Sequence, residues 1–187
     1  MSRVILILSD ALRYDVAVAN MGFLGHLVES KLTSLYKIIG ELPSMSRPMY
    51  ETIHTGVPSS AHGIVANSIV RRSFMQNIFQ SVSGAGRSTA AAAYYWISEL
   101  YNRAPYDRID DKEIDDGSLA IQHGRFYTED DYPDIELFSL RRISSANFHL
   151  IIYCFTPWAW IITARPLVLI QRNIATMPFV RICGWRH

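Results

Sequence analysis

A short run of β-branched and leucine residues near the N-terminus, residues 3–9, most constrains the fold. A continuous apolar run bounded by polar residues is typical of a strand that is buried on both faces, as in a parallel sheet. Asp10 follows this run directly, at the predicted carboxyl end of the strand, where open α/β sheets bind their ligands. Asp10 is therefore a candidate metal ligand, and an aspartate that only caps the following turn is the alternative.

Helical and β-prone segments alternate along the rest of the chain. The predicted helices lie at 20–31 with Asn20 as N-cap, at 47–54, at 73–85 and at 135–144. The predicted strands lie at 3–9, 32–39, 88–95 and 147–153, and residues 102–131 are interpreted as an irregular surface excursion. This order predicts an α/β fold, a partial doubly wound and mainly parallel sheet with flanking helices.

A polar stretch rich in small residues, residues 44–67, lies between two of these apolar runs. Ser46 is the predicted N-cap of the helix at 47–54, Pro48 suits its first turn, and Gly56 is a natural stop. A hydroxyl at a helix N-terminus is a favourable place to bind an anion, although a plain N-cap fits equally well. A serine attacks unaided only poorly, so a catalytic Ser46 needs a metal or a base.

Other potential metal ligands have spacings that do not suit a metal site. His54 and His62 stand eight residues apart across a loop with glycine and proline, and we interpret them as hydrogen-bonding partners of that loop. Four aspartates lack the spacing and the closing glutamate of a calcium loop, so a solvated face is expected there. These are Asp110, Asp111, Asp115 and Asp116.

Composition narrows the class of protein and its partners. The 187 residues suit one domain, and the net charge of +1 with scattered basic residues argues against a nucleic-acid polymer as partner. The apolar run at 4–8 is too short for a signal peptide, and Cys154 and Cys183 make no disulfide framework. We therefore expect a cytoplasmic chain without membrane contact, and the sequence does not indicate its oligomeric state.

The composition changes abruptly in the C-terminal part. After Glu136 there is no acidic residue, whereas six arginines follow. One interpretation is a membrane-associated segment over 148–170, although Pro157 and Arg165 interrupt it. The other is that residues 154–187 are an aberrant apolar and basic tail, translated out of frame after an N-terminal part of the domain at 1–153.

Three segments together resemble the alkaline phosphatase superfamily, nearest to its nucleotide pyrophosphatase/phosphodiesterase branch. They are I-L-I-L-S-D-A-L-R at the N-terminus, S-R-P-M-Y-E-T-I-H-T-G-V-P-S-S-A-H-G-I-V-A-N and N-I-F-Q-S-V-S-G-A-G-R-S-T-A-A-A-A-Y-Y-W, and the resemblance extends over about residues 3–153. It implies that Asp10 is a metal ligand, that Ser46, ten residues before Gly56, is the nucleophile and also a metal ligand, and that Asn67 contacts substrate. Met49 stands where the family has asparagine, and the loop has one extra residue between Pro58 and His62.

The resemblance implies a phosphoesterase with two divalent metal ions, usually zinc, that acts on a small-molecule phosphate ester. Nucleotide, phospholipid, phosphonate and sulfate esters share this half of the site. The family's later Asp and His ligands are missing after Tyr153. Back-translation from Cys154 in a shifted frame permits a sequence similar to the family's L-x-H-P-x-G-x-D metal loop, which favours the out-of-frame interpretation.

A chain without these later ligands is expected to be truncated and weakly active or inactive, with at most one weakly bound metal. The alternative is a non-catalytic α/β binding module that associates with a membrane through its apolar tail.

Overall fold

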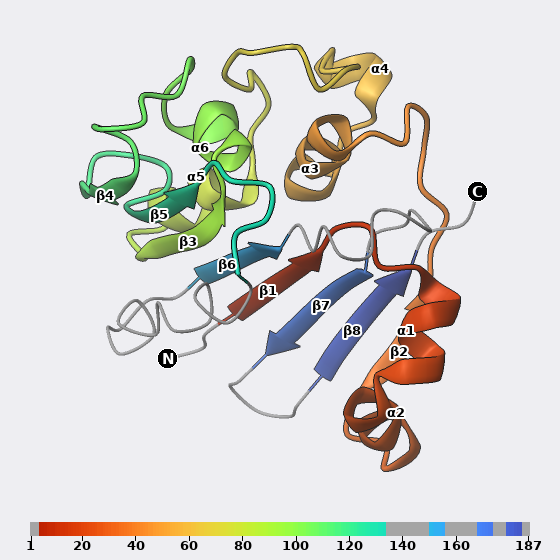
Figure 1. The fold of residues 1–187 in the computed structure, drawn as a ribbon. Helices are drawn as coiled ribbons and strands as arrows, with labels where there is room; N and C mark the ends of the chain where they lie inside the picture. The colour runs from red at the N-terminus through yellow and green to blue at the C-terminus, as the bar shows by residue number, and fades with distance from the viewer. Residues whose placement is uncertain (1–3, 134–149, 156–167, 174–178, 185–187) are drawn as a thin grey trace.

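The computed structural model describes residues 4–133, 150–155, 168–173 and 179–184, and its strands form a single sheet (Figure 1). The sheet has eight strands in the order β2-β8-β7-β1-β6-β3-β5-β4. The strands are β1 (Val4–Ser9), β2 (Ser34–Lys37), β3 (Thr89–Tyr94), β4 (Glu113–Asp115), β5 (His123–Tyr127), β6 (Leu150–Phe155), β7 (Val168–Asn173) and β8 (Phe179–Gly184).

Strand β1 lies inside the sheet, parallel to β6 on one side and antiparallel to β7 on the other. Strand β3 is parallel to both β6 and β5, and β2 is parallel to β8. Strands β4 and β5 are antiparallel to each other, as are β7 and β8. The α/β class is therefore confirmed, whereas this sheet is mixed and its doubly wound, mainly parallel character stays a prediction.

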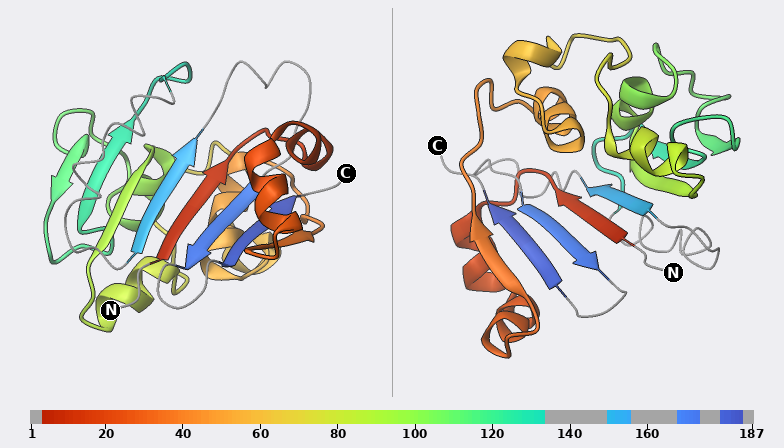
Figure 2. Two further views of the ribbon diagram at one scale, coloured as in Figure 1. Left: turned by 90° about the horizontal axis from the view of Figure 1, so that it is seen from below. Right: turned by 180° about the vertical axis from the view of Figure 1, so that it is seen from behind.

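Helices cover both faces of the sheet. Helices α1 and α2 lie on the face opposite α3 and α4, near β2 and β8 (Figure 2). The helices are α1 (Tyr14–Asn20), α2 (Gly22–Glu29), α3 (Ser46–Thr55), α4 (Ser59–His62), α5 (Ile78–Gly84) and α6 (Trp96–Tyr101). None of the helices described here is long and apolar enough to cross a membrane.

Side chains along β1 and β3 point alternately to the two faces of the sheet, so the core is divided between these faces. Leu6, Leu8, Ala91 and Ala93 point into the larger cluster, which α3, α5 and α6 complete with residues such as Tyr50. Their neighbours along each strand contribute to a second cluster on the other face. All four consecutive alanines of β3 are fully buried, Ala91 and Ala93 in the larger cluster and Ala90 and Ala92 in the second.

Several predicted elements are confirmed. The strands predicted at 3–9, 32–39 and 88–95 correspond to β1, β2 and β3, and the helix predicted at 47–54 corresponds to α3. Gly56 ends α3 in the left-handed conformation, with φ of 71°. The strand predicted at 147–153 corresponds to β6 from Leu150 onward. The helix predicted at 135–144 lies outside the described residues.

Two predicted helix starts were wrong. Asn20 does not cap a helix but ends α1, where its side-chain amide donates to the Val16 carbonyl over 2.8 Å, and α2 starts at Gly22. The helix predicted from residue 73 begins only at Ile78, because Asn77 and Gln80 form a capping box there. The main-chain N–H of Ser73 instead donates to the Leu100 carbonyl over 2.8 Å, a tertiary contact that no local pattern shows.

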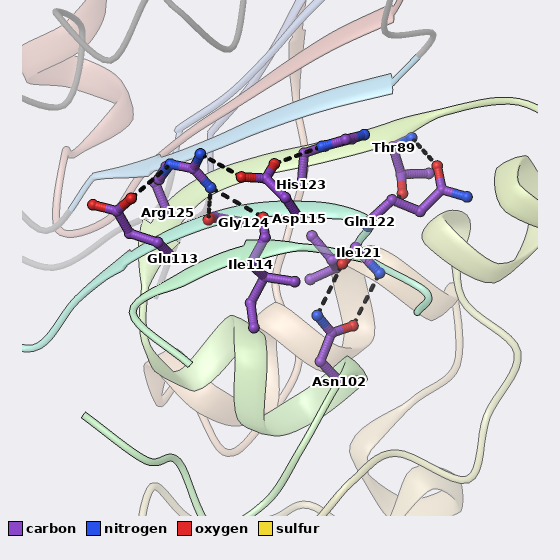
Figure 3. Close-up of polar contacts among 10 residues, drawn as sticks. All are labelled: Thr89, Asn102, Glu113, Ile114, Asp115, Ile121, Gln122, His123, Gly124 and Arg125. Carbon is purple, nitrogen blue, oxygen red and sulfur yellow. Dashed lines mark hydrogen bonds and ion pairs between the residues drawn. The ribbon is translucent and has the colours of Figure 1, made fainter. Parts of the chain in front are cut away.

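The interpretation of 102–131 as an irregular excursion was also wrong, because this segment supplies β4 and β5 (Figure 3). Long-range contacts fix the start of β5. The Asn102 side chain exchanges two hydrogen bonds of 2.9 Å with the main chain of Ile121, and the Thr89 N–H donates to the Gln122 side chain. Since these partners are distant in sequence, the local pattern did not predict the strand.

Strands β7 and β8 lie within the segment 154–187, and their backbones pair with β1, β2 and each other. Residues 154 and 155 end β6. The rest of that segment, and with it most of the apolar run at 148–170, lies outside the described residues. The boundary near residue 153 and the out-of-frame origin of the tail stay predictions.

Candidate active site at the start of helix α3

Asp10 lies where β1 ends, and both of its carboxylate oxygens accept hydrogen bonds. Oδ1 accepts from the Ala11 N–H over 2.8 Å, and Oδ2 accepts from the Tyr50 hydroxyl over 2.9 Å. Ala11 is buried and has a φ of 61°, a left-handed conformation that is uncommon for a residue with a Cβ. Such strain clusters at functional sites, where the surrounding structure maintains it.

Ser46 is the first residue of α3 and is half-buried. The N-cap is Met45, with an extended backbone and no side-chain capping bond, so the prediction of Ser46 as N-cap was wrong by one residue. Pro48 lies in the first turn, as predicted. Because Tyr50 follows Ser46 by one helical turn, its bond to Asp10 brings the end of β1 close to the start of α3.

Asn67 lies against the same first turn. Its side-chain Oδ1 accepts a hydrogen bond of 3.0 Å from the main-chain N–H of Arg47, the residue after Ser46. This bond fixes the orientation of the amide, so its Nδ2 group is the part that can donate to another molecule. The structure thus brings together the regions of Asp10, Ser46 and Asn67, the three residues that the sequence analysis selected.

Most main-chain N–H groups of this turn already donate hydrogen bonds within the protein or are absent. A helix N-terminus usually has free N–H groups that can bind an anion. The Arg47 N–H donates to Asn67, Pro48 has no N–H, and the Met49 N–H donates to the Met45 carbonyl over 3.0 Å. A phosphate group near Ser46 therefore depends chiefly on side chains and on any bound metal for its stabilisation.

Sequence reasoning missed the ion pair behind this turn. Arg47 is 1% exposed, and its guanidinium donates to Glu99 Oε2 over 2.6 Å. The partner lies in α6, far along the chain. No local signal identifies such a pair. The one available indication was that Arg47 is a charged residue next to the candidate nucleophile.

His62 has the role in loop hydrogen bonding that the sequence suggested. Its Nδ1 accepts from the Ile64 N–H over 3.1 Å, so Nε2 carries the proton and donates to the Thr52 hydroxyl over 3.0 Å. Thr52 in turn donates to Glu41 over 2.9 Å. Burial is the main cause that lowers the pKa of His62, so the ring is neutral in this network.

His54 points into the core rather than toward Asp10 or the loop. It is 1% exposed, and its Nδ1 lies 3.0 Å from the Tyr101 hydroxyl, which donates to Glu51. Burial lowers the pKa of His54 to about 3. Within the described part of the chain its Nε2 has no hydrogen-bond partner, and the ring packs against Phe79. The prediction that it bonds the loop was therefore wrong for His54.

The four aspartates of the acidic segment do not form a metal site. Asp110 is exposed, and Asp115 pairs with His123 and Arg125 at the sheet edge (Figure 3). Asp111 is buried and accepts from Arg103 and from the Asp107 N–H, so the prediction of a solvated face was wrong for this residue.

The fit of a metal to this site depends on Asp10. Its two hydrogen bonds leave lone pairs on both oxygens, and hydrogen-bonded carboxylates are common metal ligands. Among the described residues, no group of three or more His, Cys, Asp or Glu side chains could hold a metal ion. Asp10 therefore fits as one ligand, and the described residues supply no complete ligand set for either metal.

Comparison with known proteins identifies the family of the chain. The sequence model of the type I phosphodiesterase / nucleotide pyrophosphatase family matches residues 4–130, which include β1, Asp10, α3 and Asn67. No curated protein and no solved structure matches the chain. Since the match extends over more than half of the sequence, the chain belongs to the type I phosphodiesterase / nucleotide pyrophosphatase family.

Proposed function

We propose that this chain is a metal-dependent phosphoric ester hydrolase of the phosphodiesterase type, with Ser46 as its nucleophile and Asp10 as a metal ligand. Membership of the family supports the class of reaction. The assignment of residues rests on one observation: Asp10 and Asn67 both form hydrogen bonds with residues near the start of α3. Asp10 is bonded to Tyr50, one turn after Ser46, and Asn67 is bonded to the residue that follows Ser46.

Each side chain has a distinct part in this proposal. The Ser46 hydroxyl attacks phosphorus, the bond between phosphorus and the leaving oxygen breaks, and the Ser46 proton leaves on that oxygen as part of an alcohol. Water then hydrolyses the phosphoseryl group and restores the Ser46 hydroxyl. The Asn67 amide donates from Nδ2 to a phosphate oxygen, since its Oδ1 is occupied by the Arg47 N–H. Tyr50 and the Ala11 N–H hold the Asp10 carboxylate in one orientation. A divalent ion held by Asp10 and Ser46 supplies Lewis-acid activation of the hydroxyl.

The family generally binds divalent metals, and we propose zinc for this chain, by the resemblance. One carboxylate and one hydroxyl bind a divalent metal weakly, because strong sites have three or four protein ligands. We therefore expect slow turnover on a small-molecule phosphate ester. This expectation goes with the proposal that residues 154–187 are translated out of frame. The DNA sequence tests the latter, and an uninterrupted frame that encodes the same tail in related genes would overturn it.

Hydrolysis of bis(p-nitrophenyl) phosphate with and without added zinc tests the proposed reaction. We expect weak, zinc-stimulated release of p-nitrophenol that Ser46→Ala reduces by a factor of at least about 100, as removal of a nucleophile usually does. Ser60→Ala, an exposed serine of α4, is the matched control and should retain the wild-type rate. Hydrolysis that persists in Ser46→Ala refutes the role of Ser46. An absence of hydrolysis with every divalent metal tested favours the non-catalytic binding module.

A further inference from the structure

Arg47 and Glu99 form an ion pair that is almost completely buried directly behind Ser46. Their side chains are 1% and 5% exposed, and Nη2 lies 2.6 Å from Oε2. The other guanidinium amine donates to the Ile69 carbonyl over 3.1 Å, and the group lies 4.7 Å from the centre of the Trp96 ring. Glu99 also accepts the Tyr106 N–H through its second oxygen over 3.0 Å.

Stability alone is a poor explanation for this pair. Removal of two charges from water costs several kcal/mol per ion, and apolar residues of similar volume often replace buried pairs without loss of stability. The cost is higher here, because the described residues provide no hydrogen-bond partner for the buried Arg47 Nε. In some proteins buried polar or ionic groups are retained because they select one geometry.

The geometry that this pair selects involves both Ser46 and Asn67. Arg47 binds the segment that contains Asn67 at two points, through its main-chain N–H to the Asn67 side chain and through its guanidinium to the Ile69 carbonyl. Glu99 fixes the same guanidinium to α6. The first turn of α3, the loop at 67–69 and α6 are therefore joined through one side chain.

We infer that Arg47 and Glu99 are positioning residues, which set the Ser46 hydroxyl relative to the Asn67 amide. This inference rests on the proposed function, since it concerns the orientation of the proposed nucleophile. Neither side chain is exposed enough to touch a substrate, so both act through their neighbours. The pair thus determines whether Ser46 and Asn67 face the same phosphate group.

The double variant Arg47→Met/Glu99→Leu tests the inference, because it removes both charges and leaves neither unpaired. We expect a melting temperature close to that of the wild type, with kcat lower by about 10–100-fold, the scale expected for a displacement of about 1 Å. KM should change much less than kcat, since the affected interaction concerns the nucleophile. Arg47→Lys retains the charge and should recover part of the loss. A double variant that is folded and has the wild-type kcat overturns the inference.

Hydrogen exchange of the main-chain N–H at position 47 provides a readout that does not need activity. Its partner is the Asn67 side chain, so we expect exchange to accelerate by about tenfold or more when the pair is removed, as bonded amides lose protection on local opening. Arg103→Met, which removes a half-exposed arginine bonded to Asp111, is the matched control and should leave this exchange unchanged.

The two readouts separate the possible failures. If the wild type does not hydrolyse phosphate esters, the proposed function fails, and the exchange measurement still decides whether the pair orders this turn. Unchanged exchange in the double variant overturns the inference even when activity is lost. If the double variant does not fold, the same exchange measurement in Glu99→Gln decides, because this variant removes the charge of Glu99 and retains its shape. Wild-type protection together with wild-type kcat in that variant also overturns the inference.

Discussion

The Tyr50 hydroxyl donates to Asp10 Oδ2 over 2.9 Å, and this bond joins helix α3 to the end of strand β1. Tyr50 itself is completely buried and Asp10 is partly exposed, so the bond links the core to the end of β1. Its position makes it the contact through which the candidate metal ligand is oriented toward the turn that contains Ser46. The first prediction concerns this bond.

Tyr50→Phe removes the bond and retains the ring. We expect the affinity of the chain for zinc to fall by about 10–100-fold, the usual loss when a partner of a metal ligand is removed. Isothermal titration with zinc measures the effect. Tyr106→Phe removes a weak hydroxyl contact of 3.4 Å to the Phe126 carbonyl, away from Asp10, and should leave zinc affinity unchanged. Equal affinities in wild type and Tyr50→Phe would contradict a role for Tyr50 in orienting Asp10.

His54 is expected to make stability depend on pH. Burial lowers its pKa from 6.5 to about 3, so between these values the unfolded chain binds a proton that the folded chain does not. The contribution of the neutral His54 ring to the free energy of unfolding is therefore complete above pH 6.5 and is lost as the pH falls toward 3. At pH 5 the loss is about 2 kcal/mol, from about 1.4 kcal/mol per pH unit. Burial raises the pKa of neighbouring Glu51, which acts in the opposite direction above pH 4.5.

Comparison of variants isolates the contribution of His54. Urea unfolding of wild type and His54→Leu at pH 7 and pH 5 gives the difference between their free energies of unfolding at each pH. We expect the free energy of unfolding of the wild type, relative to that of His54→Leu, to be about 2 kcal/mol lower at pH 5 than at pH 7. Only the wild type contains the buried imidazole. A difference that is independent of pH would mean that His54 binds a proton equally in both states.

Gly56→Ala should destabilise the protein through backbone strain alone. Gly56 has a φ of 71°, and a Cβ built there meets no atom within 4 Å. The cost is therefore the left-handed conformation itself, about 1–2 kcal/mol, which thermal or urea unfolding measures. Gly84→Ala is the matched control, since a Cβ there is also free of contacts and its φ is not positive. Gly84→Ala should be neutral or slightly stabilising, and equal losses in both variants would refute this explanation.

Asn77→Ala should remove the cap of α5. The Asn77 side chain accepts from the Gln80 N–H over 3.0 Å, and the Gln80 side chain accepts from the Asn77 N–H in return. Loss of an N-cap of this kind costs about 1 kcal/mol, measurable by urea unfolding. Gln76→Ala, one residue earlier and exposed, should change the free energy of unfolding by much less. A stability of Asn77→Ala equal to that of the wild type would show that α5 does not depend on this cap.

Local sequence signals were sufficient to predict many of the strands and helices that precede residue 95. The apolar run before Asp10 was sufficient to predict β1, and proline in the first turn with glycine at the end was sufficient to predict α3. These signals are local because strand propensity, proline and left-handed glycine act within a few residues. The same is true of the motif that indicated Asp10, Ser46 and Asn67.

Tertiary structure alone decided the contacts that connect these residues. Tyr50 and Asp10 are 40 residues apart, Arg47 and Glu99 are 52 apart, and Arg47 and Asn67 are 20 apart. Strand β5 likewise forms because β3 lies beside it, although its own sequence suggested an irregular segment. Sequence by itself determined which residues are candidates for a phosphate site. The fold decided which of them meet, because hydrogen bonds and ion pairs depend on distances that only the packed chain sets.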